Sequence, residues 1–305
     1  MKPTPERPAI GIDLGGTNLR SGLVFPDGRI EQLTREETPK DRERIFPRLQ
    51  EIIDTLSARE PVAAVGIAVP GAVEGDMVTS NNLGWQGIHV AERLRTNDAP
   101  LVVENDMSAA AAGEHCFGAG KGCNNMILLT ISTGIGAGII IGGKLQTGAH
   151  GVAGEVGHHV VNLNGLLCGC GRRGCWEMIA SGTAHKRRVR EAFRDGTWPN
   201  LTDEPSVADV TRMAEGGDKA AIALLKRTGR YIGIGLANLV NLYDPDVIVL
   251  TGGFARNTWN ILHKYMEAEM DEQALTASVN LALTELGDNA GLLGAATLAR
   301  RVECS

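Results

Sequence analysis

Short apolar runs broken by glycine-rich turns make up the first third of the chain. Residues 9–13 form an apolar run that stops at the turn Gly-Gly-Thr-Asn of residues 15–18, and apolar positions then alternate up to residue 24. A strand, a tight turn and a second strand are therefore predicted. Apolar positions recur at helical spacing between residues 45 and 56, which predicts a helix there. The buried-type runs 62–69 and 101–105 predict two further strands.

The same layout starts again at residue 126. An apolar run, residues 126–131, leads into the turn Ser-Thr-Gly-Ile-Gly of residues 132–136, and a second apolar run follows. A long apolar helix is expected at about residues 220–242, and a strand at residues 246–250 breaks at Thr-Gly-Gly. Alternating strands and helices on one repeated plan predict an α/β fold of two domains, with the cleft between them as the expected ligand site.

Composition narrows the class of protein. The chain has 305 residues, of which 43% are apolar, and no apolar run approaches the ~20 residues that a membrane span requires. The net charge is −6 and the cationic residues form no stripe beyond a short cluster at 186–188, so neither a membrane nor a nucleic acid is an expected partner. The N-terminus lacks the apolar segment of a secretory signal, so the expected compartment is the cytoplasm.

Glycine is over-represented, because 39 of the 305 residues is nearly twice the average usage of ~7%. The backbone N–H groups of a glycine turn can converge on an anion, and the missing Cβ lets a phosphate come close. Two such turns with the hydroxyl residues Thr17, Ser132 and Thr133 favour a nucleotide site, with plain hairpin turns as the alternative. Neither turn has the Gly-Lys-Ser/Thr of a Walker loop, and Gly134-x-Gly136 leads into β-type residues rather than the helix of a dinucleotide-binding fold.

Three cysteines crowd into the eight positions 168–175, in a glycine-rich loop that follows two histidines. Three thiolates and one imidazole are the ligands of a closed tetrahedral zinc site, and four protein ligands leave no position for a reactive water. A structural zinc knuckle is therefore predicted, and three ordinary reduced thiols are the alternative. The spacing alone leaves open whether His158 or His159 is the fourth ligand. The predicted thiolate ligands are Cys168, Cys170 and Cys175, and free thiols are expected at Cys116, Cys123 and Cys304.

Three carboxylates stand beside these features. Asp106 follows a predicted strand where a helix starts, so it is either a general base near the positive helix N-terminus or an ordinary N-cap. Glu155 and Glu177 flank the knuckle and are expected to lie near each other once it folds. Together with an amide such as Asn105 they could hydrogen-bond the hydroxyls of a sugar, although solvated surface charge is the usual role of glutamate.

Nine segments, in order, resemble the ROK family of sugar kinases and repressors between residue 10 and about residue 297. They are IGIDLGGTN, VPGAV, NLGW, VENDMSAAAAGE, TISTGIGAGII, GVAGEVGHHVV, CGCGRRGCWE, IVLTGG and GDNAGLLGAA. The resemblance implies a two-domain, actin-like ATPase (ribonuclease H-like) fold that binds ATP and a sugar. It implies domains of residues 1–114 with about 291–305, and of residues 115–290.

The resemblance also implies roles for individual residues. Asp106 matches the catalytic base, and the motif that places the ligand after Gly-Glu-x-Gly selects His158 for zinc, with His159 as a surface neighbour. With one ring nitrogen on zinc, His158 could donate from the other to a sugar hydroxyl. Mg²⁺ would use Asp13. The implied sugar contacts are Gly71, Asn81, Asn82, Asn105, Asp106, Glu155, His158 and Glu177. The implied ATP contacts are Asp13, Gly15, Gly16, Thr17, Asn18, Thr133, Gly134, Gly136, Gly252 and Gly253.

Substrate and assembly are expected from the same resemblance. The motifs are most similar to bacterial glucokinases, which phosphorylate the 6-hydroxyl of glucose, with an N-acetylglucosamine, N-acetylmannosamine or fructose kinase as the alternative. A repressor is disfavoured because only about nine residues precede the motif IGIDLGGTN, too few for a helix-turn-helix domain. The expected partners are a sugar and ATP, with a second copy of the chain in a homodimer.

Overall fold

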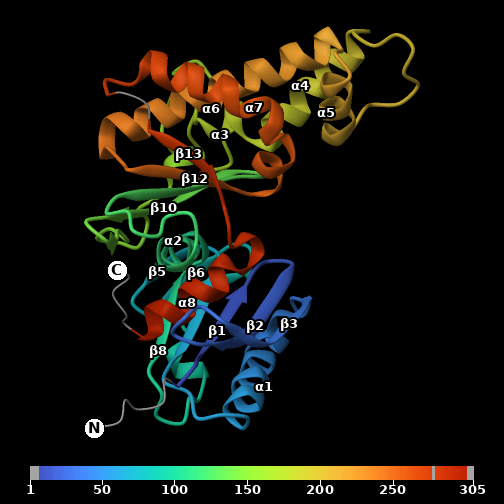
Figure 1. Ribbon diagram of the computed structural model, residues 1–305. Helices are drawn as coiled ribbons and strands as arrows, with labels where there is room; N and C mark the ends of the chain where they lie inside the picture. Colours follow the sequence, from blue (N-terminus) through green and yellow to red (C-terminus); the bar gives the residue numbers. More distant parts are fainter. Residues whose placement is uncertain (1–6, 277–278, 301–305) are drawn as a thin grey trace. The chain divides into compact units, whose positions relative to one another are not determined.

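The chain forms two compact units in the computed structural model, which describes residues 7–276 and 279–300 (Figure 1). Unit 1 comprises residues 1–128, 138–154 and 284–305, and unit 2 comprises residues 129–137 and 155–283. This division follows packing within each unit, so the domain limits near residues 114 and 290 stay a prediction. None of the helices in the described ranges is long and apolar enough to cross a membrane.

Unit 1 is built on a five-stranded sheet in the order β3-β2-β1-β4-β8. The β1-β2 and β2-β3 pairs are antiparallel, and β4 and β8 join in parallel. The glycine turn joins β1 to β2 in the predicted hairpin. The strands are β1 (Ala9–Leu14), β2 (Asn18–Val24), β3 (Ile30–Glu37), β4 (Val65–Val69) and β8 (Leu101–Asn105).

Helices cover both faces of this sheet (Figure 1). Helix α1 (Ile45–Ser57) buries its apolar stripe on one face, and α8 (Ala290–Arg300) packs on the other beside α2 (Asp106–Phe117). The approach of α8 is so close that a Cβ at Gly66 of β4 would lie 1.9 Å from the carbonyl oxygen of Ala295. Helix α8 thus packs directly against the sheet of unit 1.

A three-stranded antiparallel sheet follows β4, and the sequence pattern did not predict it. Its order is β5-β6-β7, with β5 (Ala72–Glu74), β6 (Met77–Ser80) and β7 (Trp85–His89). These strands are only three to five residues long and mix buried with exposed positions, so they lack the apolar run by which the others were recognised. Short 3₁₀ helices lie at Arg42–Arg44, Ala91–Arg93, Val156–His158 and Gly287–Asn289.

The second large sheet repeats the plan of the first, in the order β11-β10-β9-β12-β13. A hairpin of two strands again joins at a glycine turn, and a later strand adds a parallel neighbour, β13, to β12. The two sheets thus confirm the repeated layout inferred from the sequence. The strands are β9 (Met126–Ile131), β10 (Ile135–Ile141), β11 (Lys144–Leu145), β12 (Val247–Thr251) and β13 (Asn280–Leu283).

The helices of unit 2 pack around its longest member, α6 (Lys219–Tyr243). Asp218 caps its first turn, and it ends at Asp244, which adopts a left-handed conformation. Gly229 and Gly233 in α6 allow α7 to approach closely. A Cβ at Gly229 would lie 2.8 Å from the Cβ of Tyr265, and a Cβ at Gly233 would lie 2.6 Å from the Cβ of Glu269. The other helices of the unit are α3 (Glu177–Ala180), α4 (Gly182–Arg194), α5 (Val207–Glu215) and α7 (Gly253–Gln273).

Candidate functional site

The first glycine turn is held tightly and presents its tip to solvent. The N–H of Gly15 donates to the carbonyl of Asn18 at 2.8 Å, which closes the hairpin. The Thr38 hydroxyl donates to the carbonyl of Gly15 at 2.6 Å, and its N–H donates to the carbonyl of Thr17 at 2.8 Å. Gly16, Thr17 and Asn18 are exposed. The turn is therefore a fixed backbone surface that an anion can approach.

Asp13 lies at the end of β1, directly before this turn. Its side chain is 15% exposed and one Nη of Arg20 lies 3.3 Å from the carboxylate, while the other Nη of Arg20 lies 3.2 Å from Asp288. Burial raises the pKa of Asp13, and the Arg20 guanidinium opposes that rise. Carboxylate oxygen is the ligand type that Mg²⁺ prefers, so Asp13 fits the metal role inferred for it.

Asp106 is the first residue of α2, but it is not the cap of that helix. Asn105 is the N-cap, and its side-chain oxygen accepts from the N–H groups of Met107 at 2.9 Å and Ser108 at 3.1 Å. The carboxylate of Asp106 accepts from the same Met107 N–H at 2.8 Å. The carboxylate of Asp106 thus lies at the N-terminus of α2, where backbone N–H groups converge.

Gly71 lies next to Asn105, and Asn82 lies next to the first glycine turn. The amide of Asn105 donates to the carbonyl of Gly71 at 2.9 Å, so much of its hydrogen-bonding capacity serves the fold. Gly71 has φ +115°, and a Cβ there would lie 2.3 Å from a backbone oxygen of β6. Asn81 and Asn82 are exposed in the turn after β6, and a Cβ on Gly16 would lie 3.5 Å from the Cβ of Asn82. Asn82 thus lies directly beside the first glycine turn.

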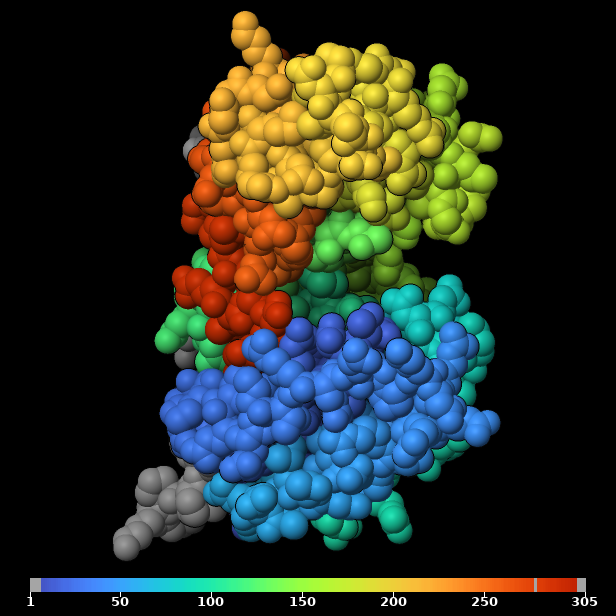
Figure 2. Space-filling model, turned by 90° about the vertical axis from the view of Figure 1, so that its right-hand side faces the viewer, coloured from blue at the N-terminus to red at the C-terminus, as the bar shows by residue number. Residues whose placement is uncertain are grey.

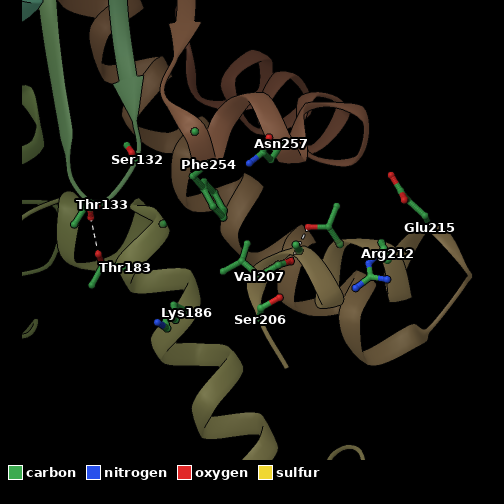
Figure 3. A pocket seen from close by; sticks show the side chains of 14 residues that line it. Ser132, Thr133, Thr183, Lys186, Ser206, Val207, Arg212, Glu215, Phe254 and Asn257 are labelled. Carbon is green, nitrogen blue, oxygen red and sulfur yellow. Dashed lines mark hydrogen bonds between the residues drawn. The ribbon is translucent and has the colours of Figure 1, made fainter. Parts of the chain in front are cut away.

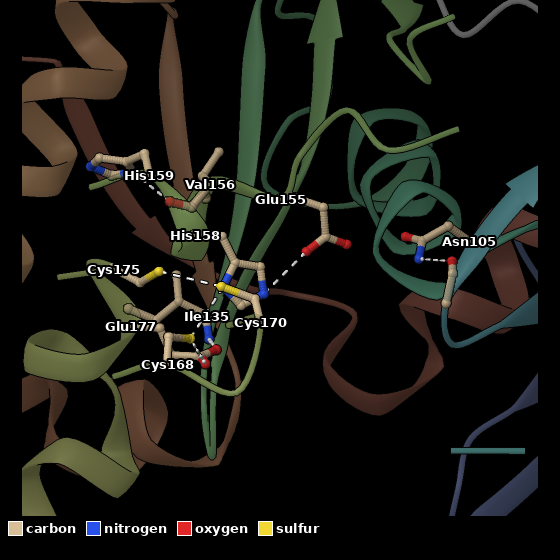
Figure 4. Close-up of polar contacts among 11 residues, drawn as sticks. Asn105, Ile135, Glu155, Val156, His158, His159, Cys168, Cys170, Cys175 and Glu177 are labelled. Carbon is tan, nitrogen blue, oxygen red and sulfur yellow. Dashed lines mark hydrogen bonds and ion pairs between the residues drawn. The ribbon is translucent and has the colours of Figure 1, made fainter. Parts of the chain in front are cut away.

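The predicted knuckle residues converge in unit 2 (Figure 4). The ligand atoms of His158, Cys168, Cys170 and Cys175 all lie within 4.8 Å of one another. The His158 Nδ1 to Cys168 Sγ distance and the Cys170 Sγ to Cys175 Sγ distance are both 3.6 Å. Zinc bonds of ~2.3 Å to sulfur and ~2.1 Å to nitrogen, at tetrahedral angles, require ligand separations of about 3.6–3.8 Å. The donor set and its spacing therefore fit zinc.

The thiol pKa values differ within the cluster. Burial raises the pKa of Cys175 to about 12, and a backbone N–H from Arg172 lowers the pKa of Cys170. Arg172 and Arg173 are exposed beside the cluster and add positive charge. Because thiolates rather than thiols bind metal, zinc binding at Cys175 would be coupled to proton release.

The two histidines have different surroundings, which resolves the choice between them. Nε2 of His158 lies 3.7 Å from the carboxylate of Glu155, while Nδ1 faces the sulfurs. The ring of His159 packs on Trp176 at 5.3 Å, its Nδ1 contacts the carbonyl of Val156, and its Nε2 lies 3.4 Å from the amide of Asn238. His158 belongs to the cluster, and His159 is a packed residue rather than the expected surface neighbour, because the buried indole of Trp176 supports its ring.

Glu177 joins the knuckle to the second glycine turn (Figure 4). One carboxylate oxygen accepts from the N–H of Ile135 at 2.9 Å, and the other lies 4.0 Å from the sulfur of Cys168. A Cβ at Gly134 would lie 2.3 Å from Glu177 Oε2. No local sequence pattern predicts this contact, because 42 residues separate Glu177 from Ile135.

The second glycine turn is also tied to the start of α4. The N–H of Gly182 donates to the carbonyl of Ser132 at 2.8 Å, and the Thr183 hydroxyl donates to the carbonyl of Thr133 at 2.7 Å. Gly136 lies within β10, one residue after Ile135. The turn is thus fixed from two sides, by α4 and by Glu177.

A cavity of about 620 Å³ opens beside this turn, wholly within unit 2 (Figure 3). Of the predicted nucleotide contacts, Thr133 and Gly253 line it, and Gly252, with φ +91°, directly precedes Gly253 at the start of α7. The cavity has a mixed lining, because Phe254 offers an apolar ring among charged and polar groups. Sequence reasoning missed seven polar lining residues: Thr183, Lys186, Ser206, Thr211, Arg212, Glu215 and Asn257.

These missed residues come from helices far apart in the chain. Lys186 lies on α4, Arg212 on α5 and Asn257 on α7. The segment around residue 200 that joins α4 to α5, yellow in Figure 2, lies at the surface of unit 2. Lys186 was visible in the sequence only as part of a short basic cluster, which carried no indication of a cavity.

The remaining cysteines differ from expectation in one position. Cys123 is a reduced cysteine outside any disulfide, as predicted. Cys116 is disulfide-bonded, which corrects the prediction of a free thiol, because the pairing of distant cysteines depends on the tertiary fold rather than on local spacing. Cys304 lies outside the described residues.

Comparison with known proteins gives one consistent family. The sequence profile of the ROK family matches residues 9–302. The chain is 35% identical to a glucokinase of Streptomyces coelicolor, over 95% of this chain and 97% of that protein. The crystal structure of a ROK family glucokinase from Streptomyces griseus in complex with glucose and AMPPNP is similar, with a TM-score of 0.79 and 34% identity over 97% of this chain and all of that one. A xylose repressor of Bacillus subtilis is 30% identical over 95% of this chain and 76% of its own length.

Proposed function

Because the chain belongs to the ROK family, whose actin-like ATPase fold it has, we propose that it is an ATP-dependent kinase that phosphorylates the 6-hydroxyl of glucose. The observation that carries the proposal is Asp106, a carboxylate in the first turn of α2 whose helix is capped by a different residue, Asn105. Its position at the start of α2, beside the capping residue Asn105, suits a catalytic role. The similarity to glucokinases supports glucose as the sugar.

The proposed chemistry is in-line phosphoryl transfer with Asp106 as general base. Such transfer depends mainly on positioning and on neutralising charge at the phosphates. Asp106 accepts the proton of the sugar hydroxyl as that oxygen attacks the γ-phosphorus, and ADP leaves with the electron pair of the broken bond. When bound, Mg²⁺ would neutralise phosphate charge, and Asp13 is the residue proposed to hold it.

We propose that the two glycine turns and the cavity of unit 2 hold ATP. The first turn supplies Gly15, Gly16, Thr17 and Asn18, and the second supplies Thr133, Gly134 and Gly136, with Gly252 and Gly253 at the start of α7. The cavity volume of about 620 Å³ lies in the range of ~300–1,000 Å³ typical of small-molecule sites. Lys186 and Arg212 add positive charge that suits a polyphosphate.

The proposed sugar contacts are polar groups with geometry to exchange hydrogen bonds with hydroxyls. His158 is the most informative, because Nδ1 faces the sulfurs and Nε2 faces Glu155. If the cluster held zinc through Nδ1, the other ring nitrogen, Nε2, would carry the hydrogen and could donate to a sugar hydroxyl, and Glu155 could accept from another. The other proposed contacts are Gly71, Asn81, Asn82, Asn105 and Glu177.

The test is ADP release by the purified protein with ATP, Mg²⁺ and each of five sugars: glucose, mannose, fructose, N-acetylglucosamine and N-acetylmannosamine. We expect the highest kcat/KM with glucose. Turnover of an N-acetyl sugar or of fructose without turnover of glucose would replace the proposed substrate within the same family. Release of no ADP with any of the five would contradict the kinase proposal.

A sugar-responsive repressor is the second candidate, because a xylose repressor is 30% identical to this chain. A repressor would bind sugar and DNA without consuming ATP. Calorimetry with glucose, together with a gel-shift assay on promoter DNA, separates the two. Sugar binding with a DNA shift and no ADP release would favour the repressor.

The homodimer implied by family resemblance stays a proposal. Light scattering on the purified protein tests it, and a particle of twice the 32.3 kDa chain mass is expected. A particle of single chain mass at micromolar concentration would contradict it.

A further inference from the structure

Glu177 touches two parts of unit 2 that the proposed function assigns to different substrates. Its Oε2 accepts from the N–H of Ile135 at 2.9 Å, at the end of the second glycine turn. Its Oε1 lies 4.0 Å from the sulfur of Cys168, a knuckle residue. A side chain that only bound a sugar would not need a backbone partner in the phosphate turn.

Gly134 lies directly beside this carboxylate. A Cβ at Gly134 would lie 2.3 Å from Glu177 Oε2, which is closer than non-bonded atoms approach. A side chain at this position would therefore displace the Glu177 carboxylate. Displacing Glu177 would release its hydrogen bond to the N–H of Ile135.

The backbone of Glu177 is fixed by its neighbours. Trp176 is fully buried, its Nε1 donates to the carbonyl of Tyr231 at 2.7 Å, and its N–H donates to the carbonyl of His159 at 2.9 Å. Cys175, a knuckle ligand, precedes Trp176, and the N–H of Met178 donates to its carbonyl at 3.0 Å. The direction of the Glu177 side chain thus depends on how the knuckle loop is held.

We propose that Glu177 is a positioning residue that couples the metal state of the knuckle to the second glycine turn, so that zinc raises the affinity for nucleotide even without sugar. This inference rests on the proposed nucleotide role of the turn. Every contact that carries it lies in unit 2. It predicts a nucleotide effect where a pure sugar contact predicts none.

The experiment is calorimetric titration of AMPPNP with Mg²⁺ into sugar-free protein, with zinc content measured on each sample. We expect Glu177→Ala to weaken AMPPNP binding about tenfold, the usual effect of losing one hydrogen bond to a charged group. Glu177→Gln retains an oxygen that can accept from Ile135 N–H, so its affinity should stay within about threefold of the unsubstituted protein. Equal AMPPNP affinity in all three proteins would overturn the proposal.

A second measurement compares AMPPNP binding before and after zinc is removed. Stripping zinc with a chelator should weaken AMPPNP binding about tenfold in the unsubstituted protein and by less than about twofold in Glu177→Ala, because the coupling residue is already absent. Losses of the same size in both proteins would contradict coupling through Glu177. Circular dichroism on each sample checks that the fold persists.

A Gly134→Ala substitution gives an independent check. Alone it should weaken AMPPNP binding through its clash with Glu177, and adding Glu177→Ala should remove that extra loss. Additive losses would contradict the proposed contact. If the unsubstituted, zinc-loaded protein failed to bind AMPPNP at all, the proposed kinase function would fail instead, so the two failures are distinguishable.

Discussion

Gly235 in α6 offers a sharp test of how the knuckle is anchored. A Cβ at this position would lie 1.9 Å from Cε2 of Trp176, whose indole is fully buried. In the sequence, Trp176 stands between the knuckle residue Cys175 and Glu177. Carbon atoms pack at ~3.5 Å or more, so Gly235→Ala forces the ring to move by about 1.6 Å. That movement would break the 2.7 Å hydrogen bond from Nε1 to the carbonyl of Tyr231.

The expected cost follows from these contacts. Overpacking costs ~1–3 kcal/mol and the lost hydrogen bond ~1 kcal/mol, while alanine gains ~1 kcal/mol of helix propensity over glycine. The net loss in the free energy of unfolding is therefore about 2 kcal/mol, which lowers Tm by about 4–8 °C. Calorimetric melting of the zinc-loaded protein measures it.

Gly216→Ala is the matched control for this substitution. Gly216 ends α5 with φ −76°, and a Cβ there would meet its nearest neighbours at 3.4 and 3.5 Å, which is ordinary contact. Its Tm should stay level or rise slightly, because alanine restricts the unfolded chain. A Gly235→Ala protein that melts with or above the unsubstituted protein would refute the close packing of Trp176 on α6.

Two further predictions concern the knuckle and a buried histidine. The Cys170→Ser substitution replaces one knuckle ligand and should lower the zinc content. It should also weaken glucose binding at least tenfold, because His158 and Glu177 lose their support. Calorimetry with glucose measures the affinity, and an unchanged affinity in zinc-poor protein would count against this prediction. Burial lowers the pKa of His185 to about 3, below its unfolded value of ~6.5, so its contribution to stability is complete above pH ~6.5 and is lost as the pH falls toward 3. Urea unfolding at pH 7.5 and 5.0 should show that loss as about 2 kcal/mol at pH 5.0, which His185→Gln should abolish, and an equal pH dependence of both proteins would exclude His185 as its source.

Several features of the site were predictable from local sequence. The glycine turns, the hairpins around them and the repeated order of strands follow from apolar runs and turn residues, whose signals extend over a few positions. The candidate thiolate ligands Cys168, Cys170 and Cys175 were predictable because the crowding of cysteines within one loop is itself a chemical signal. The same local signal could not separate His158 from His159, since that choice depends on the distant ring of Trp176 and on Asn238.

Other features depend on residues that meet only in the folded chain. Lys186, Arg212 and Asn257 line one cavity from three separate helices, and none stands in a recognisable motif. Gly134 looked like a position kept open for a phosphate, yet its nearest neighbour is the carboxylate of Glu177. The role of Asn105 as N-cap was equally hidden, because a cap and an active-site amide look the same in sequence.

The most direct test of the central claim compares the unsubstituted protein with Asp106→Asn. ADP release with ATP, Mg²⁺ and glucose gives kcat, and calorimetry gives the glucose affinity of each protein. If Asp106 is the general base of a glucose kinase, Asp106→Asn should lower kcat by at least ~100-fold and leave glucose affinity within about threefold, because only proton transfer is lost. A kcat for Asp106→Asn within tenfold of the unsubstituted protein, or glucose-dependent ADP release by neither protein, would contradict the account.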